Sequence, residues 1–372
     1  MSLYPVSKFG RYGYIDEKGL IPVIKPQYDM AFSFSDGFGR VKLNGKFGFI
    51  NHLGNLVIEC IYDDAHDFSE SLCPVKKGGK YGYIDKSGKM VIDPSFEFAD
   101  QFSSGLARVK DRGLYGYIDK SGKYAIEPTY SIAKNFTEDL ALIAETAYYG
   151  WIYGFIDKKG KAVIKPKFEV AKEFSNGLAL VSEGRWGFVN SKGKYVIKPQ
   201  FSFAESFSDG LAVIGAKGNS EWSYGYIDTN GKIVIEPSFE YAYSFSEGLA
   251  AVKIADVPAK IVAEQYENAI LKKLKGNYIT TLNKYYLDEG TEFRLASGVN
   301  DKDRNIIRDI LDLAGVRLGN SKYGYIDKSG RTIIPPHFDN AEPFVNGVAK
   351  VIVAKKTGYI NIAGEFIWEP TV

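Results

Sequence analysis

The stretch KYGYIDKSGKMVIDP, residues 80–94, and its continuation FEFADQFSSGLARV, residues 96–109, recur along the whole chain. An aromatic residue followed by glycine marks each copy. The clear aromatic-Gly pairs begin at Tyr12, Phe47, Tyr81, Tyr115, Tyr153, Trp186, Tyr224 and Tyr323, and a degenerate ninth pair begins at Thr357. Most intervals are about 34 residues. A fixed period of this length predicts a repeat architecture that grows by adding units.

Each repeat contains three strand-like segments. They are the Ala-x-Val strand (residues 105–109), the aromatic-Gly strand (residues 81–85) and a third strand (residues 89–94). Turns rich in Gly, Asn and Asp separate them, so each repeat is expected to form a three-stranded antiparallel meander. We expect proline to end the third strand because it has no N–H group for a ladder. Period-2 alternation predicts that the variable x residue faces outward while Ala and Val face inward.

The repeats follow one another in phase. The chain opens on an Ala-x-Val strand at residues 3–6 and closes on a third strand at residues 364–370, which gives nine whole units. Closed propellers usually have roughly four to eight blades of about 40 residues. Nine shorter units therefore favour an all-β, open superhelical array, or β-solenoid, with the weak ninth unit as a terminal cap. A β-propeller-like closure is the alternative.

The repeated motif resembles that of the bacterial WG-repeat family. The aromatic-Gly-x-Ile-Asp-x-x-Gly-Lys and Phe-x-x-Ala-x-x-Phe-x-x-Gly-Leu-Ala-x-Val patterns carry the resemblance, which extends over all but residues 254–321. Only the copy at Trp186-Gly187 has the literal Trp-Gly pair, and the other clear copies have Tyr or Phe. The resemblance implies a bacterial repeat scaffold that serves interactions, and it implies no catalytic residues.

The interruptions of the period all fall in one hairpin of the repeat, which joins the Ala-x-Val strand to the aromatic-Gly strand; we call it the motif hairpin. The separation between these strands is 6 residues in five units. It is larger in the fifth, seventh and eighth units, between Ile143 and Tyr153, Ile214 and Tyr224, and Val252 and Tyr323. The chain thus divides into repeats at 1–253, an insertion at 254–321 and further repeats at 322–372. Insertions confined to one face often mark the binding side of a repeat protein.

The expanded hairpins supply the candidate binding residues. Helical spacing after Pro258 and again from about Asp301 predicts a small α-rich subdomain within the insertion. Aromatic side chains at loop positions are typical of interaction hot spots. The candidates are Tyr148, Tyr149, Trp151 and Trp222 in the shorter expansions, and Tyr266, Lys272 and Lys273 in the insertion. The alternative is that the aromatic residues only lengthen their own hairpins or pack against the insertion.

Composition and motifs argue against several functional classes. A formal net charge of +2 gives no reason to expect nucleic acid, and no apolar run is long enough to insert into a membrane. The three histidines lack metal-ligand spacing, and no phosphate loop or nucleophile motif occurs. We therefore expect no cofactor, no metal and no enzymatic activity.

An aspartate recurs in the turn that follows the aromatic-Gly strand. The second, sixth and ninth units have Asn51, Asn190 and Asn361 at this position instead. Asparagine serves a turn equally well but cannot act as a general acid. We therefore predict that Asp16, Asp85, Asp119, Asp157, Asp228 and Asp327 are turn residues rather than catalytic or calcium-binding groups.

These observations predict a non-enzymatic scaffold that binds a protein partner through the face with the expanded hairpins and the helical insertion. One alternative is the binding of a carbohydrate, such as a cell-envelope glycan, by the loop aromatics. A less favoured alternative is an enzyme with a site between the insertion and the array. No signal peptide is evident, which predicts a cytoplasmic protein if the N-terminus is native, and an exported one if a leader has been removed.

Overall fold

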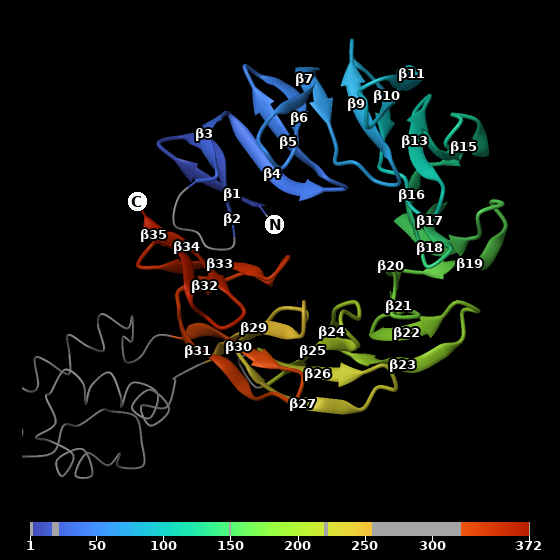
Figure 1. Ribbon diagram of the computed structural model, residues 1–372. Helices are drawn as coiled ribbons and strands as arrows, with labels where there is room; N and C mark the ends of the chain where they lie inside the picture. The colour runs from blue at the N-terminus through green and yellow to red at the C-terminus, as the bar shows by residue number, and fades with distance from the viewer. Residues whose placement is uncertain (1–2, 17–21, 149, 219–221, 255–320, 372) are drawn as a thin grey trace, which may run out of the picture. The chain divides into compact units, whose positions relative to one another are not determined.

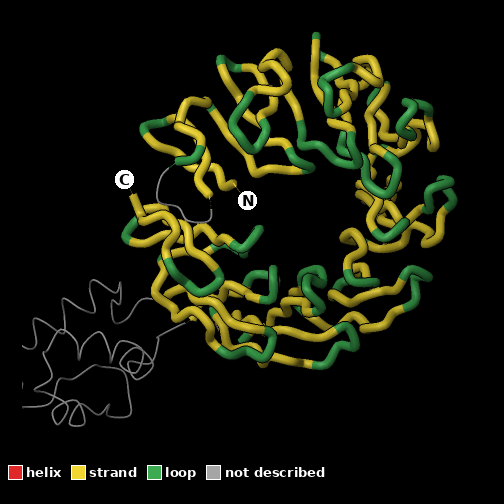
Figure 2. The backbone as a smooth tube through the Cα atoms, viewed as in Figure 1, coloured by secondary structure: helices red, strands yellow, loops and turns green. Residues whose placement is uncertain are grey.

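In the computed structural model, the described residues are 3–16, 22–148, 150–218, 222–254 and 321–371. They form strands, turns and loops with no helix among them (Figure 2). The helical subdomain expected at 254–321 falls almost entirely on residues 255–320, which lie outside the described ranges. The chain divides into two compact units. The first runs to Phe207 and includes Thr229–Gly231, and the second comprises Ser208–Asp228 and the residues from Lys232 onward.

The first unit begins with a three-stranded antiparallel sheet, which five four-stranded antiparallel sheets follow (Figure 1). In each sheet the strands lie side by side in chain order. The strands are β1 (Leu3–Lys8), β2 (Arg11–Asp16), β3 (Ile24–Tyr28); β4 (Met30–Ser35), β5 (Phe38–Leu43), β6 (Lys46–Ile50), β7 (Leu56–Tyr62); β8 (Asp64–Ala65), β9 (Leu72–Lys77), β10 (Lys80–Asp85), β11 (Met90–Phe96); β12 (Phe98–Ala99), β13 (Ala107–Asp111), β14 (Leu114–Ile118), β15 (Tyr124–Tyr130); β16 (Ile132–Thr137), β17 (Leu140–Ala147), β18 (Gly150–Ile156), β19 (Ala162–Phe168); β20 (Val170–Ser175), β21 (Leu178–Ser182), β22 (Trp186–Asn190), β23 (Tyr195–Phe201); and β24 (Phe203–Ala204).

The second unit continues the same pattern. Its strands are β25 (Leu211–Lys217), β26 (Trp222–Asp228), β27 (Ile233–Phe239); β28 (Tyr241–Ala242), β29 (Leu249–Ile254), β30 (Lys322–Asp327), β31 (Thr332–Phe338); and β32 (Asn340–Ala341), β33 (Val348–Val353), β34 (Lys356–Asn361), β35 (Phe366–Thr371). Eight of the nine sheets that the described residues form have four strands. We number the nine sheets as blades one to nine in chain order.

The additional strand of each four-stranded blade comes from the segment expected only to cross between repeats. In blade four, Phe98 pairs with Lys110 and Ala99 pairs with Val109, so the two-residue strand β12 lies beside β13. We call β4, β8, β12, β16, β20, β24, β28 and β32 the inner strands. The last strand of each blade, such as β15, is the outer strand. In five blades this strand has only two residues, too few to show an alternating pattern, and in β4, β16 and β20 its pairing shifts register, which is why the sequence predicted three strands.

The blades bury both of their faces. The variable x residue of the Ala-x-Val strand is buried at Leu142, Leu180, Val213 and Ala251, so the expectation that it faces outward is wrong. A sheet that lies between two neighbouring blades is covered on both faces. The alternation of residues along a strand does not distinguish such a sheet from one that is buried on a single face. In the first unit the blades follow an arc, with the inner strands on its concave side (Figure 1). Four-stranded sheets arranged in this way are β-propeller blades.

The fold is therefore all-β and of the β-propeller type, with nine blades. The expectation of an open solenoid of stacked three-stranded meanders is wrong. The physical reason is the inner strand, which completes each blade and places it beside its neighbours with both faces covered. The repeat of about 34 residues is long enough for four strands because the inner strand is formed by the segment that links one outer strand to the next Ala-x-Val strand.

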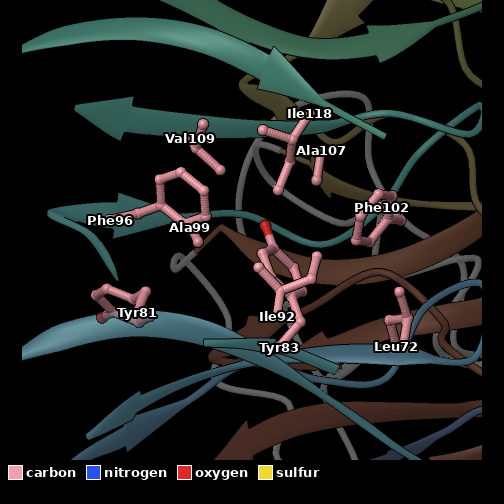
Figure 3. Packing of buried hydrophobic residues seen from close by; sticks show 10 residues of the cluster. All are labelled: Leu72, Tyr81, Tyr83, Ile92, Phe96, Ala99, Phe102, Ala107, Val109 and Ile118. Atoms are coloured by element: carbon pink, nitrogen blue, oxygen red, sulfur yellow. The ribbon is translucent and has the colours of Figure 1, made fainter. Parts of the chain in front are cut away.

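The apolar core lies between successive blades rather than within one of them. Tyr83 and Ile92 of blade three meet Ala99, Phe102 and Val109 of blade four in one buried cluster (Figure 3). The rings of Tyr83 and Phe102 are 5.0 Å apart between centroids. Each blade therefore gains most of its stability from its neighbours, as in other repeat proteins.

Proline does not end the outer strand. Strand β15 continues for two residues beyond Pro128, and its pairing with β14 changes register on either side of Gly116. A Cβ atom on Gly116 would lie 2.6 Å from the carbonyl oxygen of Ile126. The proline thus sits in a β-bulge whose backbone lies directly on the motif glycine. The prediction that the third strand ends at proline is wrong. Proline has no N–H group to donate, but at the bulge the strand can continue without that hydrogen bond.

Hydroxyl groups link one blade to the next. The Ser103 hydroxyl donates to the Phe136 carbonyl at 2.7 Å, and the Ser175 hydroxyl donates to the Phe207 carbonyl at 2.7 Å. Ser35, Ser69, Ser208 and Ser246 donate to the next blade in the same way. At Thr137 the equivalent hydroxyl oxygen is buried without a hydrogen-bond partner.

Thr137→Ser is expected to raise the free energy of unfolding by about 1 kcal/mol, because serine can make the link found in the other blades. Urea unfolding followed by circular dichroism measures the change. The reciprocal change, Ser103→Thr, is expected to lower the same free energy. An unchanged unfolding midpoint in Thr137→Ser would show that the hydroxyl link contributes nothing.

Candidate functional site

The motif hairpin of blade five is a longer strand pair rather than a longer loop. Strands β17 and β18 pair as far as Ala147 and Gly150, whereas β13 and β14 of blade four end at Asp111 and Leu114. Trp151 therefore lies in strand β18, not in a loop, and its side chain is 39% exposed. Tyr148 at the turn is 90% exposed, and Tyr149 lies outside the described residues. The extension projects aromatic side chains on a hydrogen-bonded frame.

The other candidate residues belong to the motif hairpins of blades seven and eight. Trp222 begins strand β26, opposite Lys217, and is 37% exposed. Its ring stacks on Tyr224 with centroids 6.4 Å apart and planes 24° apart. In blade eight the chain leaves the sheet after Ile254, whose cross-strand partner is Lys322. The remaining candidates, Tyr266, Lys272 and Lys273, lie outside the described residues.

A carboxylate holds the short motif hairpin in blades two, three, four, six and nine. Asp63, between the outer strand of blade two and the inner strand of blade three, accepts the Gly78 N–H at 3.1 Å and pairs with Lys46. The hydrogen bond from Lys46 holds the pKa of Asp63 below its usual value. Asp29, Glu97, Glu169 and Asp339 occupy the same position and accept a turn N–H in the same way.

Serine replaces this carboxylate in two of the three blades with an extended hairpin, whereas blade eight keeps Glu240. The residues at this position are Ser131 before blade five and Ser202 before blade seven. An extended hairpin carries its turn farther from the junction, where a carboxylate can no longer reach the turn N–H groups. The replacement is visible in the sequence and marks the two shorter extensions, but it does not mark the blade with the long insertion.

A continuous row of aromatic rings runs across blades seven and eight. The row consists of Trp222, Tyr224, Tyr241, Tyr243 and Tyr323, and we call it the aromatic row. Successive ring centroids after the Trp222 pair are 5.6, 5.0 and 6.2 Å apart. Tyr241 is 41% exposed. Of these residues only Trp222 was a candidate, because the inner strand that carries Tyr241 was not recognised from the sequence.

Two carboxylates flank the aromatic row. Glu240, next to Tyr241, pairs with Lys253 at 3.1 Å, and a hydrogen bond from Ser321 together with that lysine lowers its pKa. Glu342 pairs with Lys350 at 2.8 Å. Burial raises the pKa of both Tyr243 and Tyr323, and nearby phenol and carboxylate groups add to the increase. The phenols therefore stay neutral, and the row combines apolar ring faces with hydrogen-bonding edges.

The recurring aspartates serve the turns, as predicted, at Asp85, Asp119, Asp157, Asp228 and Asp327, whereas the turn after Asp16 lies outside the described residues. The Asp85 carboxylate accepts N–H groups from Ser87 at 2.9 Å and Lys89 at 3.1 Å. Asn51 makes the equivalent bonds to Leu53 and Asn55 at 3.0 and 3.1 Å. The hydrogen bonds to Ser87 are the main reason that the pKa of Asp85 is lowered. These carboxylates are satisfied by their own turns.

No group of three or more His, Cys, Asp or Glu side chains in the described ranges could hold a metal ion. The same ranges contain no helix that is long and apolar enough to cross a bilayer.

Comparison with solved structures returns β-propellers at low similarity. Hsv2 of Kluyveromyces lactis matches at 10% identity over 70% of this chain and 92% of its own, with a TM-score of 0.38. The β-propeller domain of the Trilobed protease from Pyrococcus furiosus matches at 10% identity over 68% and 91%, with a TM-score of 0.35. The Neurospora crassa Pan2 WD40 domain matches at 14% identity over 63% and 88%, with a TM-score of 0.33. Similarity at this level carries no functional conclusion.

The sequence itself gives the clearer comparison. No curated protein matches the chain significantly. The family model for the WG containing repeat matches eight times, at residues 12–47, 47–81, 81–115, 115–145, 153–184, 186–218, 224–256 and 323–356. These matches begin at the eight aromatic-Gly pairs and cover well over half of the chain. The resemblance drawn from the motif is thereby confirmed, and the chain belongs to the family of WG-containing repeat proteins.

Proposed function

We propose that this protein is a non-enzymatic scaffold that binds a protein partner through the blade ends that carry the extended motif hairpins. The observation that supports this most is the exposure of Tyr148, Trp151 and Trp222 on paired strands and their turns. Large aromatic side chains held on a rigid frame are typical of the residues that dominate binding energy at protein interfaces.

The architecture supports this role in a second way. The extensions of blades five, seven and eight all occur in the motif hairpin, and in blades two, three, four, six and nine this hairpin is short and held by a carboxylate. Variation confined to one connection leaves the blade-to-blade contacts intact. A repeat scaffold can acquire a binding surface in this way without loss of stability.

The experiment replaces the extended hairpins with a short one from the same chain. Residues 144–152 and 215–223 are each replaced by Lys-Asp-Arg-Gly-Leu, the sequence of residues 110–114. Ser131→Glu and Ser202→Glu then restore the carboxylate that holds a short hairpin. A second variant replaces residues 255–321 with Asn-Gly, so that Ile254 and Lys322 flank a two-residue turn.

Proteins retained by the parent chain from a native lysate are compared with those retained by each variant. Equal β circular dichroism and equal melting temperatures must first show that the variants are folded. We expect a specific partner of the parent to be lost from at least one variant, and from Trp151→Ser or Trp222→Ser as well. A partner retained by all variants, or no protein retained by the parent, would contradict the proposal.

Glycan binding is the second candidate, and one observation favours it. The exposed Trp222 ring stacks nearly parallel on Tyr224, which gives a flat aromatic surface of the kind that sugar rings contact. Binding of a soluble glycan that survives replacement of residues 255–321 but is lost in Trp222→Ala would support this candidate over a protein partner.

A further inference from the structure

Arg40 shows how the repeat holds a guanidinium group. Its guanidinium carbon lies 3.8 Å from the ring centroid of Phe32 on the inner strand and 5.8 Å from that of Phe47 on the aromatic-Gly strand. The two rings are 6.3 Å apart. Arg40 also donates to the Asp67 carboxylate at 2.8 Å and to the Ala65 carbonyl at 2.6 Å. The rings of blade two, together with the carboxylate and the carbonyl of blade three, form a guanidinium site between these blades.

Arg108 repeats this arrangement in blade four. Its guanidinium carbon lies 5.3 Å from the ring of Phe98 and 4.9 Å from that of Tyr115, and the rings are 6.4 Å apart. Its Nε donates to the Asp100 carboxylate at 2.9 Å. Arg108 is 15% exposed and Arg40 is 16% exposed, so each guanidinium is covered by protein on most sides. Both arginines occupy the x position of the Ala-x-Val strand.

Blade eight has the rings of this site but no arginine. Tyr243 corresponds to Phe32, Tyr241 to Phe98, and Tyr323 to the ring on the aromatic-Gly strand. The rings of Tyr243 and Tyr323 are 6.2 Å apart, nearly the spacing found around the two arginines. The x residue is Ala251, whose methyl side chain cannot reach the rings. The ring spacing of a guanidinium site is therefore preserved without a guanidinium from the strand beneath it.

Lysine does not take the place of the missing arginine. In blades two and four, Lys42 and Lys110 lie over the ring opposite them at 4.9 and 5.4 Å. The corresponding residue of blade eight, Lys253, pairs with Glu240 instead. No cation–π contact found in the described parts of the chain involves Tyr241, Tyr243 or Tyr323. The faces of these rings thus lack the positive group that their counterparts hold.

We propose that Tyr241, Tyr243 and Tyr323 bind the guanidinium group of an arginine side chain supplied by a protein partner. This inference rests on the proposed function and names the chemical group that the partner presents. Glu240 and Glu342 lie beside the rings but already pair with Lys253 and Lys350, so the ring faces themselves provide the attraction for a positive charge. Arginine fits better than lysine because its planar guanidinium stacks on aromatic faces and still donates hydrogen bonds from its edge.

The first test uses two peptides that differ only in charge. Acetyl-Gly-Gly-Arg-Gly-Gly-amide is titrated into the full chain, and binding is followed by NMR of ring-labelled tyrosine. The control contains citrulline, which has nearly the shape of arginine but is neutral. We expect the citrulline peptide to bind about tenfold more weakly, a ratio in the range of a partly desolvated cation–π contact. Equal binding of the two peptides, or no binding of either, would overturn the inference.

The second test fills the site from within. Ala251→Arg places an arginine at the position of Arg40 and Arg108, and it is expected to abolish binding of the arginine peptide while raising the melting temperature. Ala251→Val is the matched control, because blade seven has Val213 at this position, and it should bind within twofold of the parent. Full peptide binding by a folded Ala251→Arg would overturn the inference.

A variant at an exposed residue provides a third test, in which misfolding is not expected to interfere. Tyr241→Ser changes a residue that is 41% exposed, and it is expected to weaken binding of the arginine peptide severalfold with no change in melting temperature. Phe9→Ser, at an exposed ring in blade one, should leave binding unchanged. If the chain does not distinguish the two peptides but still retains a partner from the lysate, this inference is wrong and the proposed function stands. The two failures can therefore be distinguished.

Discussion

Gly116→Ala is expected to lower the free energy of unfolding by about 3 kcal/mol, at the upper end of the usual cost of overpacking. The added Cβ would lie 2.6 Å from the Ile126 oxygen and 2.7 Å from the Pro128 nitrogen. Both are backbone atoms of the outer-strand bulge, which the ladder to β14 holds in place. The strain cannot be relieved by rotating a side chain, so the outer strand must move away from the blade.

Gly105→Ala is the matched control for this prediction. Gly105 has a φ of +85°, but a Cβ atom there would have no heavy atom within 4 Å. Its replacement is expected to cost only about 1 kcal/mol, the price of the left-handed backbone alone. Urea unfolding of both variants, followed by circular dichroism, measures the difference. Equal losses would mean that the close approach of the bulge is unimportant.

A rise of pH from 10 to 12 is expected to unfold this protein at temperatures where it is stable at neutral pH. The phenol of Tyr83 donates to the Asp100 carbonyl of the next blade at 2.7 Å, and burial raises its pKa well above the usual value. Tyr14, Tyr117, Tyr226 and Tyr325 make equivalent bonds, and burial raises their pKa values too.

The sign of this pH dependence follows from the raised pKa values. Below pH 10 the phenols are protonated in both the folded and the unfolded chain, so their stabilisation is fully present. Above pH 10 the unfolded chain releases these protons first. Each buried phenol then costs about 1.4 kcal/mol of stability per pH unit until its folded pKa is reached. Melting temperatures measured between pH 8 and pH 12 test this directly.

The variant Tyr83→Phe tests whether the loss of stability at high pH comes from ionisation of the buried phenol rather than from a general loss of stability. Phenylalanine is compatible with the position, because Phe49, Phe155 and Phe188 occupy it in other blades. The variant is expected to lose about 1 kcal/mol at pH 7, from the missing hydrogen bond, but to lose stability less steeply above pH 10. An unchanged alkaline slope would show that Tyr83 is not among the groups that titrate on unfolding.

Part of the candidate site could be recognised from sequence and part could not. Trp151 and Trp222 stood out because they lie in expansions that interrupt a regular period. Both side chains are partly exposed, which a role in binding requires. Their position on strands rather than loops depends on how far the hairpin ladder extends, which residue types do not specify. Tyr241 and Tyr243 went unrecognised because the inner strand that carries Tyr241, and that Tyr243 follows, has only two residues and shows no periodicity.

Sequence alone determined the repeat, the family, the all-β class and the turn role of Asp85 and its equivalents. These properties are local, because a repeated pattern of strand and turn residues needs no knowledge of distant contacts. Only the tertiary structure decided the number of strands in a blade and the pairing of Phe98 and Ala99. It also placed Tyr243 beside Tyr323 at the spacing that surrounds Arg40. Such features depend on the pairing of segments within one blade that lie apart in the chain, and local residue preference does not set this pairing.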